Sequence, residues 1–189
     1  MLGLSQAGYI DKVLERFSMQ NSKKGLLPFK HGVPLSDDQR PKTQEEENMM
    51  RQVPYASTVG SLMYAMLCTR PNICYSVGMV SRYQSNPGPK HWQAVKHILK
   101  YLRRTRDYML VYCCEDLIPI GYTDSDFQSN LDFRKSTSGC VFTLGGGAIS
   151  WQSIKQFVLQ TPPWRQNMLL LVKQQRKLYG SRSSFLTMV

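Results

Sequence analysis

Residues 121–151 read GYTDSDFQSNLDFRKSTSGCVFTLGGGAISW, and this stretch carries the strongest structural signal of the chain. An apolar segment ends in the pair Thr123-Asp124, and a basic run follows at 134–139. Two further apolar segments flank the glycines 145–147, an arrangement typical of a hairpin turn. A phosphate-binding loop is the alternative for these glycines, but no Lys-Ser/Thr pair follows them. The stretch therefore predicts β-strands joined by a tight turn.

The composition of the chain indicates a globular protein with a polyanionic partner. Of its 189 residues 42% are hydrophobic and 20% are charged, which argues against wholesale disorder. The formal net charge of +11 and the pI near 9.6 favour nucleic acid as the partner. Charge alone leaves open a surface that is merely basic.

Three absences bear on the cellular location. The five cysteines lack the spacing of zinc ligands and are interpreted as small buried side chains in a reducing compartment. The first residues, MLGLSQAGYIDK, lack the cationic and apolar regions of a signal peptide. The longest apolar runs, such as 63–68 and 168–172, are far shorter than a membrane span. We expect an intracellular protein, cytoplasmic or nuclear, with no membrane association and no small-molecule substrate.

Upstream of the quoted stretch the pattern is helical. Residues 1–20 contain apolar positions at helical spacing, whereas residues 21–53 contain three prolines and few large apolar side chains. The second segment is predicted to be a flexible linker. Residues 54–106 are predicted to be helical, and their clearest helix runs from Lys90 to Thr105 with a continuous apolar stripe.

Downstream of residue 106 the period changes to that of β-strands. Strands are predicted at 108–113, 117–123, 139–144 and 148–151. Helices followed by strands predict an α+β fold of two abutting modules, with a boundary near Arg106.

A series of short motifs runs in one order through the chain. The motifs are LSQAGYI at 4–10, YAS at 55–57, VGSLMY at 59–64, TRP at 69–71, NPG at 86–88 and TD at 123–124. In this order they resemble the Pol polyprotein of copia-type (Ty1/copia) retrotransposons, from residue 2 to residue 156. The resemblance implies a helix following the polymerase palm at 1–20 and thumb- or connection-like helices at 54–106. It also implies an incomplete ribonuclease H-like mixed β-sheet at 107–156.

The resemblance assigns one catalytic position, Asp124, as the first metal-binding carboxylate of ribonuclease H. The family's next carboxylate is a Glu in a Ser-Thr-x-Glu-Ala-Glu-Tyr run, yet this chain has no Asp or Glu from Phe133 to Val189. Asp126 and Asp132 are expected in the loop after the strand, where the family does not use them as replacements. Mg²⁺ needs several oxygen ligands, so Asp124 is expected to be a vestige that binds no Mg²⁺ productively. The Tyr-x-Asp-Asp motif of the family's polymerase is also absent, which excludes polymerase activity.

From Gln156 onward the resemblance to the family ends. Reading the codons of residues 164–168 one base earlier permits Met-Glu-Ala-Glu-Tyr, and the same offset over 173–180 permits Glu-Ala-Ala-Lys-Glu-Ala-Val-Trp. The hypothesis is a one-base change near codon 156 that makes residues 157–189 an aberrant tail. It would also explain the missing carboxylates, because the Glu codons would be read as parts of Arg, Gln and Lys codons.

The basic face of the predicted helix Lys90–Thr105 is the candidate for nucleic-acid binding. Its cations Lys96, Lys100, Arg103 and Arg104 lie mostly opposite the apolar stripe. They could contact the phosphates of an RNA–DNA hybrid or a duplex without reading its sequence. A solvated helix face explains the same pattern equally well, and His91 and His97 are expected on such a face.

Three functions follow from these observations. The first is a degenerate, catalytically inactive Pol fragment that binds nucleic acid nonspecifically. The second is a Mg²⁺-dependent ribonuclease H that acts through Asp124 with the help of a partner. The third is a basic nucleic-acid-binding module with a non-catalytic role.

Overall fold

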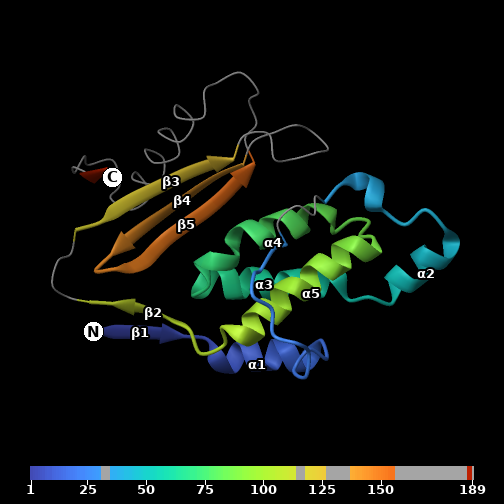
Figure 1. Ribbon diagram of the computed structural model, residues 1–189, viewed down its shortest axis with the longest axis horizontal. Helices are drawn as coiled ribbons and strands as arrows, with labels where there is room; N and C mark the ends of the chain where they lie inside the picture. Colours follow the sequence, from blue (N-terminus) through green and yellow to red (C-terminus); the bar gives the residue numbers. More distant parts are fainter. Residues whose placement is uncertain (31–34, 114–117, 127–136, 156–186, 189) are drawn as a thin grey trace, which may run out of the picture. The chain divides into compact units, whose positions relative to one another are not determined.

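The computed structural model describes residues 1–30, 35–113, 118–126, 137–155 and 187–188 (Figure 1). The chain divides into two compact units. The helical unit spans Leu4–Met109, and the sheet unit comprises Leu110–Val189 together with Met1–Gly3. The presence of both helices and sheets agrees with the predicted α+β class. The ribonuclease H-like assignment stays a prediction.

In the part of the chain that the structure describes, the helices belong to the helical unit. They are α1 (Ala7–Arg16), α2 (Gln44–Arg51), α3 (Tyr55–Cys68), α4 (Cys74–Val80) and α5 (Pro89–Arg104), with short 3-10 turns at Asp37–Gln39, Pro71–Ile73 and Ser81–Tyr83. The strands are β1 (Leu2–Ser5), β2 (Met109–Tyr112), β3 (Ile120–Asp126), β4 (Thr137–Leu144), β5 (Gly147–Lys155) and β6 (Thr187–Met188).

The core of the helical unit is built from the apolar stripes of α1, α3, α4 and α5. On α5, Val95, Ile98 and Leu102 recur at helical spacing and are fully or almost fully buried. Burial of each such side chain contributes about 1.5–3 kcal/mol, which holds the helices together. The core also includes Ile10, Val13, Leu14, Leu35, Tyr55, Val59, Leu62, Ala65, Ile73, Val77, Val80, Tyr83 and Leu99.

The segment 21–53 differs from the predicted flexible linker. It contains α2 and a 3-10 turn, and its Leu35 is only 2% exposed. The Thr43 hydroxyl accepts a hydrogen bond from the Glu46 amide, and three glutamates occupy the first turn of α2. This cap and the favourable position of the glutamates at the helix N-terminus stabilise a helix that has little apolar content.

The sheet unit contains a four-stranded sheet in the order β5-β4-β3-β6. β3 and β5 are both antiparallel to β4, and β6 is parallel to β3. The β4–β5 turn places Gly145 at φ 53° and Gly146 at φ 80°, conformations that favour glycine. The predicted hairpin turn is therefore confirmed. Phe142 on β4 is fully buried in this sheet.

The cysteines differ in burial, whereas the sequence analysis predicts that all of them are buried. None of the four that the structure describes is part of a disulfide bond. Cys140 on β4 is buried, Cys68 and Cys74 are half-buried, and Cys113 is exposed. The expected burial is confirmed for Cys140, whereas for Cys113 it is wrong, because this residue follows β2 on the surface.

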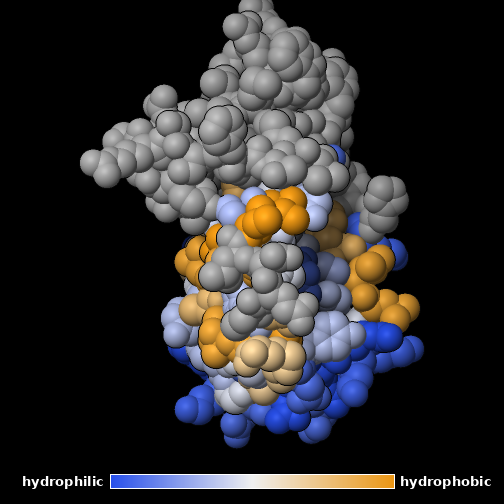
Figure 2. All heavy atoms as spheres, turned by 90° about the vertical axis from the view of Figure 1, so that its left-hand side faces the viewer, coloured by the Kyte–Doolittle hydropathy of each residue, from blue (hydrophilic) through white to orange (hydrophobic). Residues whose placement is uncertain are grey.

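β1 and β2, which contain the first and last residues of the helical unit, pair in a separate two-stranded sheet (Figure 1). These strands carry the exposed apolar side chains Leu2, Leu4 and Met109. Figure 2 looks onto the side where β1 and β2 lie in Figure 1 and shows hydrophobic spheres beside strongly hydrophilic ones. Among the described residues, no helix has the length and apolar character needed to cross a membrane.

Candidate nucleic-acid interface

Asp124 lies on β3 with an exposed side chain, opposite Gly139 of β4. The neighbouring Thr123 hydroxyl donates a hydrogen bond to the Gly139 carbonyl at 3.1 Å. Asp126 was expected in the loop but is the last residue of β3, whose pairing with β4 extends to Thr137. Asp132 lies outside the described residues.

The described residues do not fit a Mg²⁺ site at Asp124. Within them, no group of three or more His, Cys, Asp or Glu side chains is arranged to hold a metal ion. The sequence adds no carboxylate after Asp132. Two-metal hydrolysis needs several carboxylates around the ions, so we derive no catalytic step at this position.

The four predicted cations lie on the last three turns of α5. Lys96, Lys100 and Arg103 are half-buried, and Arg104 is exposed. Residues 48–106 contain no Asp or Glu, so no helix from α3 to α5 contributes a carboxylate. Among the described residues, none of the four cations has a carboxylate partner within ion-pair distance. In the described part of the chain, no ion pair therefore neutralises their charge.

Lys96 is held over an aromatic ring. Its Nζ lies 5.7 Å from the centroid of the Trp92 ring, one helical turn earlier. The ring faces of aromatic side chains attract cations, so this contact orients the ammonium group without neutralising it. Trp92 is half-buried and packs against the helical core, which fixes the position of the pair.

Sequence reasoning missed the basic residues of the segment 22–30, which lies along α5. The Gly25 amide donates a hydrogen bond to the Lys100 carbonyl at 3.0 Å. A Cβ at Gly25 would lie 3.1 Å from the Lys100 Cβ, so only glycine allows this approach without a shift. The segment brings Lys24 to the recess that Arg103 and Arg104 line. Its only signal in the sequence is the pair Lys23-Lys24 followed by a glycine.

Lys30 of the same segment and Lys100 of α5 both affect the pKa of His97. Burial first, and then the positive charges of Lys100 and Lys30, lower the pKa of His97. The shift indicates that the lysines lie close enough to the imidazole to disfavour its protonation. We call Lys24, Lys30, Lys96, Lys100, Arg103 and Arg104 together the basic surface.

His91 does not lie on a solvated helix face, and that expectation is wrong. The side chain is fully buried and stacks on the Tyr83 ring, with 4.0 Å between centroids. Its Nδ1 accepts a hydrogen bond from the Gly88 amide, and its Nε2 lies 3.1 Å from the Ser36 carbonyl oxygen. His91 thus stabilises the start of α5 instead of contacting a phosphate.

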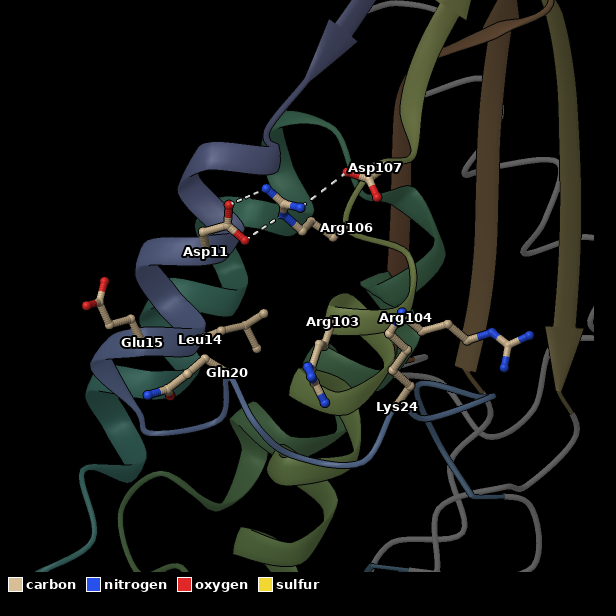
Figure 3. A pocket seen from close by; sticks show the side chains of 9 residues that line it. All are labelled: Asp11, Leu14, Glu15, Gln20, Lys24, Arg103, Arg104, Arg106 and Asp107. Atoms are coloured by element: carbon tan, nitrogen blue, oxygen red, sulfur yellow. Dashed lines mark hydrogen bonds and ion pairs between the residues drawn. The ribbon is translucent and has the colours of Figure 1, made fainter.

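A recess of about 470 Å³ opens between α1 and the end of α5 (Figure 3). Arg106 forms a two-atom ion pair with Asp11, with distances of 2.6 and 2.7 Å. Both side chains are 46% exposed, so the pair contributes little stability, but it compensates the Asp11 charge. The Asp11 interaction accordingly raises the pKa of Arg106. Arg106 is therefore not part of the basic surface.

The chain is similar to retrotransposon polyproteins of plants. It is 53% identical over 152 residues to the retrovirus-related Pol polyprotein from transposon TNT 1-94 of Nicotiana tabacum, covering 80% of this chain and 11% of that protein. It is 32% identical over 156 residues to the Pol polyprotein from transposon RE2 of Arabidopsis thaliana, covering 82% of this chain and 10% of that protein. The chain thus spans about a tenth of the length of these polyproteins.

The chain is also similar to the secreted RxLR effector protein 161 of Plasmopara viticola. The two chains are 44% identical over 108 residues, which cover 57% of this chain and 76% of that protein. No protein-family model matches the chain. No solved structure matches it either.

Proposed function

Because this chain belongs to the family of copia-type retrotransposon Pol sequences, we propose that its helical unit binds nucleic acid nonspecifically through the basic surface. We propose further that the chain has no nuclease activity of its own. The similarity supports an origin in a retrotransposon.

One observation carries the binding proposal: two segments far apart in the sequence place cations beside one another, and none of these cations forms an ion pair with a described carboxylate. α5 supplies Lys96, Lys100 and Arg103, and the segment 22–30 supplies Lys24 and Lys30. Cations gathered in this way attract the phosphates of nucleic acid and release their counterions. A hybrid and a duplex are equally suitable ligands, because this attraction does not depend on base sequence.

The absence of nuclease activity is proposed from the donor set at Asp124. Mg²⁺-dependent hydrolysis requires a cluster of carboxylates, and the family's Ser-Thr-x-Glu-Ala-Glu-Tyr run is not encoded in this frame. An assay of RNA–DNA hybrid cleavage with the wild-type chain and Asp124→Asn tests this. Equal background in both supports inactivity, whereas cleavage that Asp124→Asn abolishes would restore the ribonuclease H alternative.

Salt dependence of duplex binding tests the binding proposal. We expect the affinity of the full chain to fall steeply with salt concentration. In the double variant Lys96→Gln/Lys100→Gln, the slope of log affinity against log salt should decrease by about 2, because each phosphate contact contributes about 0.9. Fluorescence anisotropy with a labelled duplex and with a labelled hybrid measures both slopes.

The control is a double variant with the same change of charge elsewhere. Lys12 and Lys42 are exposed and lie outside the basic surface, so Lys12→Gln/Lys42→Gln should leave most of the slope intact. If both double variants reduce the slope equally, binding depends only on net charge and the basic surface is not the interface. Thermal unfolding of each variant verifies that the fold is retained.

A further inference from the structure

The recess between α1 and the end of α5 has a polarised lining. Arg103, Arg104 and Lys24 lie on the α5 side, whereas Asp11 and Glu15 lie on α1. Figure 3 shows the Arg103 side chain between Gln20 and Lys24, while the Arg104 guanidinium points away from α1. Only some of these charges are available to a ligand, as the contacts show.

The carboxylates of the recess are partly compensated and the inner cations are not. Asp11 is paired with Arg106, which also lies 3.7 Å from Asp107. Arg103 and Lys24 have no ion pair among the described residues. Glu15 also lines the recess, but Figure 3 shows its carboxylate directed away from Arg103. The net attraction for an anion is therefore greatest at the end where Arg103 and Lys24 lie.

We propose that this recess binds one phosphate group, held by Arg103 and Lys24. A guanidinium presents several N–H donors in a plane that matches two phosphate oxygens, and a lysine adds a point charge. Such charge-assisted hydrogen bonds are stronger than neutral ones. A metal ion is disfavoured here because the same two cations would repel it.

The recess is open, so the phosphate need not belong to a small molecule. Its volume of about 470 Å³ suits a phosphate with part of a sugar or base attached. Arg103 also belongs to the basic surface, so we assign the phosphate to a nucleic-acid strand that crosses the end of α5. This source rests on the proposed function, whereas the phosphate chemistry of the recess does not.

NMR of the full chain tests the proposal with inorganic phosphate as the probe. At constant ionic strength set with chloride, phosphate should shift the Arg103 Nε–Hε signal with a saturable dependence. Lys24→Gln should weaken the apparent affinity by about tenfold, since it removes one charge-assisted contact. Lys90→Gln is the matched control, because Lys90 is exposed at the start of α5 and does not line the recess. A phosphate effect that Lys24→Gln and Lys90→Gln weaken equally would overturn the proposal.

Further titrations test the phosphate site independently of the proposed function and identify the molecule to which the phosphate belongs. Lys96→Gln/Lys100→Gln should weaken duplex binding while leaving the phosphate titration unchanged. A duplex should shift the same Arg103 signal and lose part of this effect when phosphate competes. If phosphate causes no saturable shift, the proposed phosphate site in the recess is wrong, and the proposed function is unaffected. If a mononucleotide shifts the Arg103 signal as phosphate does and a duplex does not, the bound phosphate does not belong to a nucleic-acid strand.

Discussion

Two histidines six residues apart on α5 show how completely the surroundings of a side chain determine its role. His91 is buried, and its Nδ1 accepts the Gly88 amide, so the proton of the neutral ring is assigned to Nε2 facing the Ser36 carbonyl. His97 lies on another side of the helix, half-buried beside Lys100 and Lys30. His91 therefore stabilises the start of α5, whereas the pKa of His97 depends on the charges of the basic surface.

His97 should titrate below the ordinary histidine value of about 6.5 in the free protein. Burial and the two neighbouring lysines disfavour its protonated form and lower its pKa. A bound duplex would bring phosphates close and should raise this pKa again. An NMR titration of the imidazole protons, assigned with His97→Gln, measures both values.

The same pKa shift has a consequence for stability with a definite sign. The unfolded state binds the His97 proton more readily than the folded state, so stability should fall as pH decreases through about 6.5. His97→Gln should reduce this fall in a urea titration repeated at several pH values. An unchanged pH dependence in His97→Gln would show that other groups cause it.

Tyr55 should contribute measurably to stability through its hydroxyl. The hydroxyl donates a hydrogen bond to the Val80 carbonyl at 2.8 Å in a buried position. Tyr55→Phe leaves that carbonyl without this donor, so the free energy of unfolding should decrease by about 1–3 kcal/mol. Urea denaturation measures the change. Tyr108→Phe is the control, because Tyr108 is 60% exposed and its loss should cost less than about 0.5 kcal/mol.

At the scale of elements, α5 is held at both ends by backbone contacts that reach across the sequence. Gly88 precedes the helix and lies directly against the Gln39 carbonyl oxygen, where a Cβ would clash. Near the C-terminal end, the Lys100 carbonyl accepts the Gly25 amide. The basic residues of α5 are thus positioned by two segments that the sequence pattern assigns to a linker.

Gly88→Ala should therefore destabilise the helical unit. The added methyl group meets backbone atoms of Gln39 that cannot rotate away, so we expect a loss of about 1–3 kcal/mol. Gly60→Ala on α3 is the matched control, because a Cβ there meets nothing within 4 Å. It should stabilise the helix by about 0.5–1 kcal/mol. Equal effects of both substitutions in urea denaturation would contradict this account of Gly88.

The elements with strong periodicity could be predicted from the sequence, and those held by distant contacts could not. The sequence correctly predicts both the apolar stripe of α5 and the glycine turn after β4. The sequence analysis does not predict α2, although Thr43 and Glu46 have the spacing of a helix N-cap, because the segment 21–53 contains three prolines and few large apolar side chains. The placement of Lys24 beside Arg103 depends on the Gly25 contact, which no local pattern encodes.

At the scale of the whole molecule, the described parts of the two units differ in how many apolar side chains they bury. The helical unit has an extensive core made by four helices. In the described part of the sheet unit, the buried apolar side chains are Cys140, Phe142 and Ala148. Because apolar burial is the main source of stability, the helical unit should be the more stable of the two.

Unfolding of the full chain should accordingly occur in two separable steps. Limited proteolysis should first cleave after residue 109 and leave a helical fragment that resists further digestion. Mass spectrometry identifies the fragment, and its far-UV circular dichroism should retain a cooperative thermal transition. Loss of both units at the same protease concentration would contradict the difference in stability.

The Asp11–Arg106 pair joins residues 95 positions apart, and β1 lies beside β2 just beyond it. The polypeptide therefore enters and leaves the helical unit at neighbouring points. A unit with adjoining ends can be inserted into a host protein or circularly permuted without disturbing its core. Genetic rearrangement could thus move this segment between proteins as a self-contained piece, with its surface charges carried along unchanged.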